Sequence, residues 1–123
     1  MSSLSDLAVR YIERVVNRRD LTAVDEMVAD GYRGSGPGWP ATIGQLRQFY
    51  EKQMRDRPDW HIDVEHVLEL GDSVVVRAHA RGSVTEGSAQ RQMAVNWLAH
   101  YRFRDRRITE INLLSVVDVP TQP

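Results

Sequence analysis

The last third of the chain, residues 93–118, predicts a long β-hairpin. Apolar and polar side chains alternate with a period of two on either side of Asp105-Arg106, as expected for two strands around a two-residue turn. This turn sets three inward-facing pairs: Tyr101 with Glu110, Ala99 with Asn112, and Trp97 with Leu114. Asp118 falls on the same face, near the rim of the interior if the strand has no bulge. Polar groups inside this apolar face indicate that the interior has a function beyond packing.

A second hairpin is predicted before it, because residues 60–70 and 74–81 also alternate between apolar and polar positions. A two-residue loop at Gly71-Asp72 would mix apolar and charged side chains on each face. A three-residue loop that includes Ser73 keeps both faces uniform, and we therefore expect it. This register places His66 opposite Ala78, in an apolar stripe that faces the interior. Gly87-Ser88 then turns the chain into the final hairpin.

Three helices are predicted ahead of the strands, over about residues 5–18, 21–29 and 42–55, from apolar residues at three- and four-residue spacing. The stretch from Ser3 to Asp6 and the single residue Thr42 supply helix-start signals. The Gly- and Pro-rich residues 32–40 predict a short strand and a shaped loop. This order predicts one α+β domain over residues 1–123, with three N-terminal helices packed on a curved, mostly antiparallel sheet.

Composition removes several functional classes. The formal net charge of −1 gives no basic footprint for nucleic acid, and the absence of cysteine removes disulfides and thiolate chemistry. The four histidines lack metal-ligand spacing, and no glycine-rich phosphate loop precedes a helix. No apolar run approaches the roughly 20 residues of a membrane span, and no secretory signal is visible. We expect a cytoplasmic protein without metal, cofactor, membrane or nucleic-acid partners.

Three stretches resemble the nuclear transport factor 2-like fold, and within it the SnoaL-like polyketide cyclase group. They are YIERVVNRRDLTAVDEMVADGY, PDWHIDVEHVLELGDSVVVRAHARGS and YRFRDRRITEI, in that order along the chain. The resemblance implies a cone formed by the curved sheet and the helices, with an apolar internal cavity. It also implies a homodimer that pairs through the outer sheet face, on which His79 and His100 are expected to lie. Function transfers less well than fold, because this fold hosts both enzymes and binding modules.

One departure from the family pattern concerns the catalytic base. Many relatives have His-Trp-Asp directly after the Ile-x-Glu of the last strand, and the aspartate is the base in the cyclases. Here Glu110 is followed by Ile111-Asn112-Leu113. The cyclase mechanism therefore cannot be carried over residue by residue.

Four polar residues remain as candidates for chemistry. His66 is either an acid/base in the cavity or a core histidine with its hydrogen bonds satisfied. Asn112 either polarises a substrate carbonyl or bonds a neighbouring strand, and Glu110 either contacts substrate or makes a structural hydrogen bond. Asp118 is a base with a raised pKa if it is buried against Trp97 and Tyr101, and a solvated rim residue otherwise.

The aromatic residues predict an apolar binding cavity. Core packing is the alternative for each of them, and it is the expected role of Phe49 and Phe103. Trp39 lies in the Gly/Pro loop, where core packing is difficult, so we expect a lid or rim residue. The aromatic residues expected to line the cavity come from every part of the chain: Tyr11, Tyr32, Trp39, Trp60, Trp97 and Tyr101.

These observations favour a small cofactor-independent enzyme acting on an apolar oxygenated molecule, such as a polyketide intermediate of antibiotic biosynthesis. Its reaction would be acid/base cyclisation, isomerisation or ring opening of the epoxide-hydrolase kind. His66 or Asp118 would transfer the proton, and Asn112 and Tyr101 would orient or polarise an oxygen. The alternative is a non-catalytic small-molecule-binding or dimerisation module of the same fold.

Overall fold

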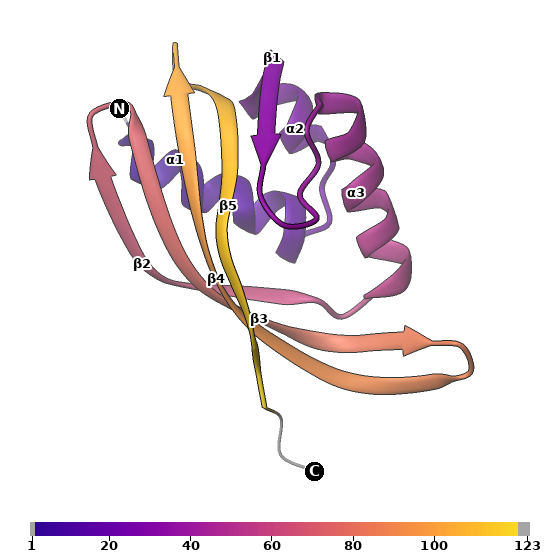
Figure 1. Ribbon diagram of the computed structural model, residues 1–123. Coiled ribbons are helices and arrows are strands. Elements are labelled where there is room, and N and C mark those ends of the chain that lie inside the picture. Colours follow the sequence, from indigo (N-terminus) through magenta and orange to yellow (C-terminus); the bar gives the residue numbers. More distant parts are fainter. Residues whose placement is uncertain (1, 121–123) are drawn as a thin grey trace.

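The computed structural model describes residues 2–120 and has three helices packed on one face of a sheet (Figure 1). The helices are α1 (Leu4–Ile12), α2 (Thr22–Met27) and α3 (Ile43–Asp56), and a π-helical segment, Glu13–Asn17, continues α1. The strands are β1 (Val28–Ser35), β2 (His61–Leu70), β3 (Ser73–Glu86), β4 (Ala89–Arg104) and β5 (Arg107–Val119). The predicted α+β class and element order are confirmed.

The helices begin where the sequence predicts. Ser3 and Thr42 are N-caps, and each forms a capping box with the residue three positions later, Asp6 or Gln45. The first helix and its π-helical continuation together cover the predicted range. The second helix is shorter than predicted, because Val28 leaves the helical conformation and starts β1. The Asp30-Gly31 pair lies inside β1, which therefore starts before the predicted residues 32–40.

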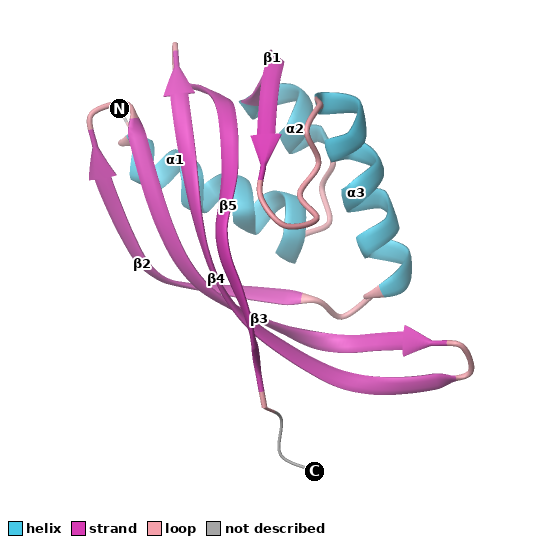
Figure 2. Ribbon diagram, viewed as in Figure 1, coloured by secondary structure: helices cyan, strands magenta, loops and turns pink. Residues whose placement is uncertain are grey.

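The sheet is open and strongly curved, with the strand order β1-β5-β4-β3-β2. Only β1 and β5 are parallel, and the other three pairs are antiparallel. Figure 2 shows all helices on the concave side, with the β3–β4 hairpin extending beyond the other strands below the C-terminal end of α3. The predicted cone-like arrangement of helices on a curved sheet is confirmed.

The predicted register of β2 and β3 is wrong. The turn has two residues, Gly71-Asp72, so that Leu70 pairs with Ser73 and His66 with Arg77. A bulge between Val64 and His66 then restores the apolar face, and Val64 pairs with Ala78. We expected a three-residue loop because it keeps each face of the hairpin uniform. In the structure, one extra residue within β2 produces the same uniform apolar face. His66 consequently faces outward.

The final hairpin has the predicted turn but a different register. Asp105 and Arg106 have φ of 51° and 63°, as a type I′ turn requires. Bulges follow in β5, so that Arg102 pairs with Glu110, Tyr101 with Ile111, Ala99 with Leu113, and Trp97 with Val116. The predicted inward position of Glu110 and Asn112 is wrong, because Ile111 and Leu113 occupy that face. Burying two aliphatic side chains is more favourable than burying a carboxylate and an amide.

The core lies between the helices and the concave sheet face. Fully buried side chains from helices and strands meet there, among them Ile12, Leu46, Val76, Ile108 and Ile111. Within residues 2–120 no polar or charged residue is buried in it. None of the helices in this part of the chain is long and apolar enough to cross a bilayer.

Candidate functional site

An apolar cavity of about 240 Å³ lies between α3, the loop after β1 and the concave sheet face. The π-helical segment contributes Val15 and Val16 to its wall. Residues from three strands and the β2 entry form the opposite wall: Trp60, Ala80, Met93, Val95, Trp97, Ala99, Tyr101, Ile111, Leu113 and Val116. The fold thus provides the internal pocket that the sequence predicts.

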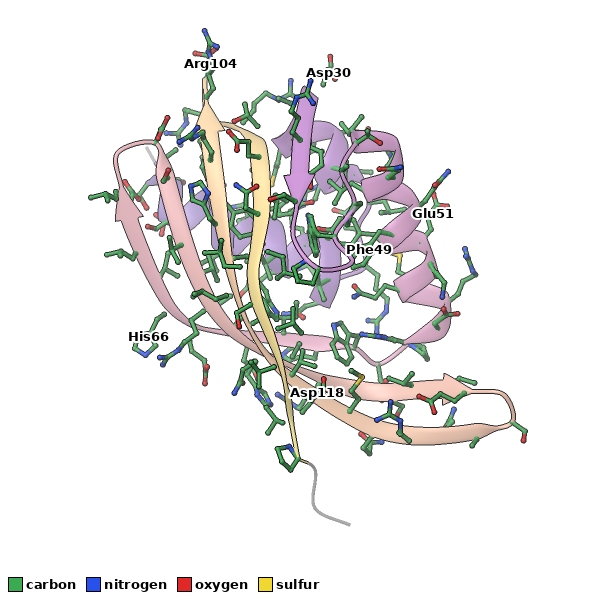
Figure 3. All side chains as sticks on the ribbon, in the orientation of Figure 1. Asp30, Phe49, Glu51, His66, Arg104 and Asp118 are labelled. Carbon is green, nitrogen blue, oxygen red and sulfur yellow. The ribbon has the colours of Figure 1, made fainter. Side chains whose placement is uncertain are left out.

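Helix α3 presents one row of side chains to this cavity. Phe49 and Gln53 are four residues apart and lie on one face of the helix, and Arg57, the C-cap residue that follows the helix, lines the same cavity. Tyr50 lies beside Phe49 with its ring edge-on at a centroid distance of 5.5 Å. Phe49, for which core packing was predicted, is half-buried and lines the cavity, and Figure 3 shows it between α3 and the sheet. The row is apolar at its start and polar at the C-terminal end of the helix.

Trp39 closes one side of the cavity, as predicted for a rim residue. Its indole Nε1 donates a hydrogen bond to the Tyr32 hydroxyl at 2.8 Å, and that hydroxyl donates to the Pro40 carbonyl at 3.1 Å. The Trp39 ring also packs on Phe49 at a centroid distance of 5.0 Å. Two hydrogen bonds and one aromatic contact therefore hold this loop in place.

The polar groups deepest in the molecule are tyrosine hydroxyls. The hydroxyls of Tyr11 and Tyr50 hydrogen-bond each other at 2.9 Å. The Tyr101 ring packs edge-on against Tyr11, but no group within residues 2–120 hydrogen-bonds its hydroxyl. Tyr101 lines the cavity, and because no fully buried side-chain oxygen or nitrogen in this part of the chain lacks a partner, its unpaired hydroxyl keeps some accessible surface. It is therefore available to a ligand.

Burial raises the pKa of every tyrosine. Desolvation raises the pKa of Tyr32 to about 12, and the hydrogen bond from Trp39 offsets only part of this. Desolvation also holds the pKa of Tyr11, Tyr50 and Tyr101 well above 10. At neutral pH these groups are neutral hydrogen-bond donors rather than bases.

We expect the raised pKa of the buried tyrosines to be measurable in an alkaline titration. Below pH 10 the tyrosines are protonated in both the folded and unfolded chain, so their contribution to stability is fully present. As the pH rises through 10 towards 12, the unfolded chain loses protons that the folded chain keeps, and stability falls. Ultraviolet difference absorbance should show little tyrosinate at pH 10 and should rise together with loss of folded circular dichroism. Half-ionisation at pH 10 in the folded protein would contradict the burial.

The structure separates the predicted acid/base residues from the cavity. His66 is exposed on the convex side of the sheet, and Figure 3 shows it pointing away from the helices. Asp118 pairs with Val95 on the concave face, but it is exposed and lies beyond the residues that line the cavity. The prediction that His66 faces the cavity is wrong, and Asp118 has the solvated position that was its alternative.

Asn112 and Glu110 belong to a polar network on the outer sheet face. Asn112 hydrogen-bonds His100 Nδ1 at 3.0 Å and accepts from Ser35 Oγ at 2.6 Å. Glu110 accepts a hydrogen bond from Arg102 at 3.2 Å. These are the structural hydrogen bonds named as alternatives for both residues. The predicted outer position of His79 and His100 is confirmed by their strand register.

The predicted aromatic lining is largely present. Trp39, Trp60, Trp97 and Tyr101 line the cavity. Tyr11 and Tyr32 are buried behind the cavity, and their hydroxyls hydrogen-bond to other aromatic residues.

Sequence reasoning missed Gln53 and Arg57, although their four-residue spacing after Phe49 was visible.

The cavity contains no carboxylate or imidazole from the described residues, and Arg57 is its only charged lining residue there. Over residues 2–120, no group of three His, Asp or Glu side chains is placed to hold a metal ion. The arrangement can therefore bind an apolar molecule, donate a hydrogen bond from Tyr101 and present a cation at one end.

A curved sheet, three helices and an apolar internal cavity define a protein of the nuclear transport factor 2-like class. The family model of the SnoaL-like domain matches residues 8–111, so the chain belongs to the SnoaL-like family. A comparison with curated proteins finds no match.

Solved structures of low sequence identity share this fold. A cystatin-fold protein from Novosphingobium aromaticivorans has a TM-score of 0.81 at 17% identity, covering 94% of this chain and 100% of that one. A SnoaL-like polyketide cyclase from Agrobacterium tumefaciens has a TM-score of 0.77 at 15% identity, with 94% and 92% coverage. An NTF2-like protein of unknown function from Burkholderia pseudomallei has a TM-score of 0.75 at 19% identity, with 91% and 90% coverage.

Proposed function

We propose that this protein is a cofactor-independent enzyme that cyclises or isomerises a small apolar carbonyl compound of the polyketide type. The observation that carries the proposal is the unpaired Tyr101 hydroxyl on the wall of an apolar cavity. A hydrogen-bond donor in a water-poor site acts strongly on a carbonyl oxygen that gains negative charge in the transition state. The similarity to a SnoaL-like polyketide cyclase supports this choice of substrate class.

The proposed step is an intramolecular aldol addition. β-Dicarbonyl compounds exist partly as enols, so the cavity need not supply a strong base to generate the nucleophile. The enol carbon of the β-dicarbonyl unit attacks the carbon of a further carbonyl on the same chain, and a carbon–carbon bond forms while the π pair of that carbonyl moves to its oxygen, which Tyr101 holds. That oxygen then takes up a proton equivalent to the one the enol hydroxyl loses. The product is an isomer of the substrate, and no oxidant or co-reactant is consumed.

The cavity contributes mainly by orienting the substrate. Trp39, Trp60 and Trp97 provide flat apolar surfaces that restrict a flexible chain to a folded conformation. The volume of about 240 Å³ lies below the roughly 300–1,000 Å³ of sites for drug-sized ligands. We therefore infer a substrate of one or two rings rather than a polycyclic one. Ring opening by activated water is less favoured, because no described Asp, Glu or His lines the cavity.

The same lack of an acid/base residue favours a second candidate, a non-catalytic protein that binds small apolar molecules. A panel of small aromatic β-diketones, each carrying a further ketone along the same chain, distinguishes the two. Incubation with the enzyme should give products of unchanged mass and changed retention time, at a saturable rate above the protein-free control. Saturable binding in calorimetry without any product would contradict the enzyme and support the binding protein.

We also propose a homodimer that pairs through the outer sheet face. Leu68, Leu70 and Val117 are 64%, 76% and 57% exposed, a large amount of apolar surface for a monomer. Leu68 and Leu70 share their face of the sheet with the His100–Asn112 pair. Sedimentation equilibrium should give twice the chain mass of 14.1 kDa, and Leu68→Glu with Leu70→Glu should return it to one chain. A monomeric wild type at all concentrations would contradict the dimer.

A further inference from the structure

Arg57 is placed to bind a ligand rather than to stabilise the fold. Its guanidinium lies over the Trp60 ring, with the central carbon 4.6 Å from the ring centroid. This contact holds the cation in position without using a hydrogen-bond acceptor. The side chain is half-buried and lines the apolar cavity.

The carboxylates next to Arg57 in the sequence are engaged elsewhere. Asp56 pairs with Lys52, and Asp59 accepts hydrogen bonds from the backbone nitrogen and the hydroxyl of Ser83 at 2.8 and 2.9 Å. No ion pair within residues 2–120 involves Arg57, whereas Arg14 contacts both Asp20 and Glu26. A guanidinium at an apolar cavity without a carboxylate partner is positioned to attract an anion from outside the chain.

Gln53 adds a second donor beside this cation. It lies in the last turn of α3, four residues before the C-cap residue Arg57, and lines the same cavity, and its side-chain amide makes no hydrogen bond to another described residue. Tyr50 marks the other end of the cavity, next to the Tyr11–Tyr101 pair. Tyr50 and Arg57 are separated by about 10 Å along the helix axis, from a rise of about 1.5 Å per residue. The cavity therefore has a neutral donor at one end and a cation with an amide at the other.

We propose that Arg57 and Gln53 form a carboxylate subsite, so that the ligand is a small apolar keto acid. This proposal rests on the proposed function for the position of the ketone at Tyr101. A carboxylate matches the planar fork of a guanidinium, which can donate two parallel hydrogen bonds to it. The aromatic middle of the cavity holds the apolar body between these two polar ends.

A pair of probes tests the carboxylate subsite directly. The first is α-tetralone carrying a carboxylate on the ring edge remote from its carbonyl, and the second is the methyl ester of the same compound. In calorimetry, wild type should bind the acid roughly tenfold more tightly than the ester, since hydrogen bonds to a charged group are stronger. Arg57→Gln should remove this preference, and Arg57→Lys should keep part of it. Arg55→Gln is the matched control, because Arg55 is exposed on the same helix and does not line the cavity.

Binding of the acid and the ester tests the carboxylate subsite independently of the proposed catalytic activity. Equal binding of acid and ester by wild type, or no binding of either, would overturn the subsite. An acid preference that survives in Arg57→Gln would also overturn it. An acid preference that is lost in Arg57→Gln and kept in Tyr101→Phe would support it, even if wild type turned over no β-diketone. Thermal unfolding of each variant verifies that the proteins compared are folded.

Discussion

Replacing Tyr101 by phenylalanine is expected to lower kcat on a β-diketone substrate by about 100-fold and to change KM little. The hydroxyl gains its strongest interaction when the carbonyl oxygen acquires charge, so its loss acts on the transition state more than on the bound ground state. The ring remains and keeps the shape of the cavity wall. Steady-state kinetics with product detection by chromatography provide both constants.

Stability measurements separate this effect from damage to the fold. The Tyr101 hydroxyl has no hydrogen-bond partner among the described residues, so Tyr101→Phe should leave the free energy of unfolding nearly unchanged. Tyr50→Phe breaks the buried hydrogen bond with Tyr11 and should cost about 1 kcal/mol. His66→Ala serves as the control for activity, because His66 lies outside the cavity. Full turnover by Tyr101→Phe, or its loss in His66→Ala, would contradict the assignment.

Gly34→Ala is expected to destabilise the protein by roughly 3 kcal/mol and to displace the Trp39 loop. A methyl group at this position would overlap the Pro40 carbonyl oxygen and the Tyr32 hydroxyl, and would lie 2.9 Å from Cδ1 of Trp39. The first of these atoms belongs to the backbone, so the clash cannot be relieved by a rotamer change. Urea unfolding followed by tryptophan fluorescence measures the loss of stability and the altered environment of Trp39.

Gly31→Ala provides the matched control in the same strand. A methyl group there would meet no atom within 4 Å, so its effect should stay within about 0.5 kcal/mol. Binding of the apolar probe should weaken in Gly34→Ala and remain at the wild-type level in Gly31→Ala. Equal stability of the two variants would show that the loop is not anchored through Gly34.

Two helix starts and two of the hairpin turns follow from local sequence signals. The capping boxes at Ser3 and Thr42, the turn at Asp105-Arg106 and the turn at Gly87-Ser88 each depend on a few adjacent residues, and the structure confirms them. The cavity could be expected from the resemblance to the nuclear transport factor 2-like fold, and the aromatic residues in every part of the chain then indicated its lining.

The side of the sheet that each polar side chain of β5 faces could not be predicted, because it depends on the positions of the bulges. Thr109 and Leu114 are the additional residues of the β5 bulges, and both are ordinary strand residues without a turn signal. Each bulge shifts all following positions by one and so reverses which side chains face inward. The alternation of Ile111 and Leu113 with Glu110 and Asn112 was the available signal, since it requires such a shift after Ile108.

The two bulges of β5 also suggest how relatives with this fold could diverge in chemistry. Four residues, Glu110 to Leu113, lie between the bulges. Because Thr109 is an extra residue, Ile111 and Leu113 face the cavity and Glu110 and Asn112 face outward. Moving that extra residue to the far side of the segment would turn a carboxylate and an amide into the cavity and two aliphatic side chains out. The rest of the hairpin would keep its pairing. A shift in bulge position would thus replace an apolar cavity wall by one that carries a carboxylate and an amide, with no substitution in the segment itself.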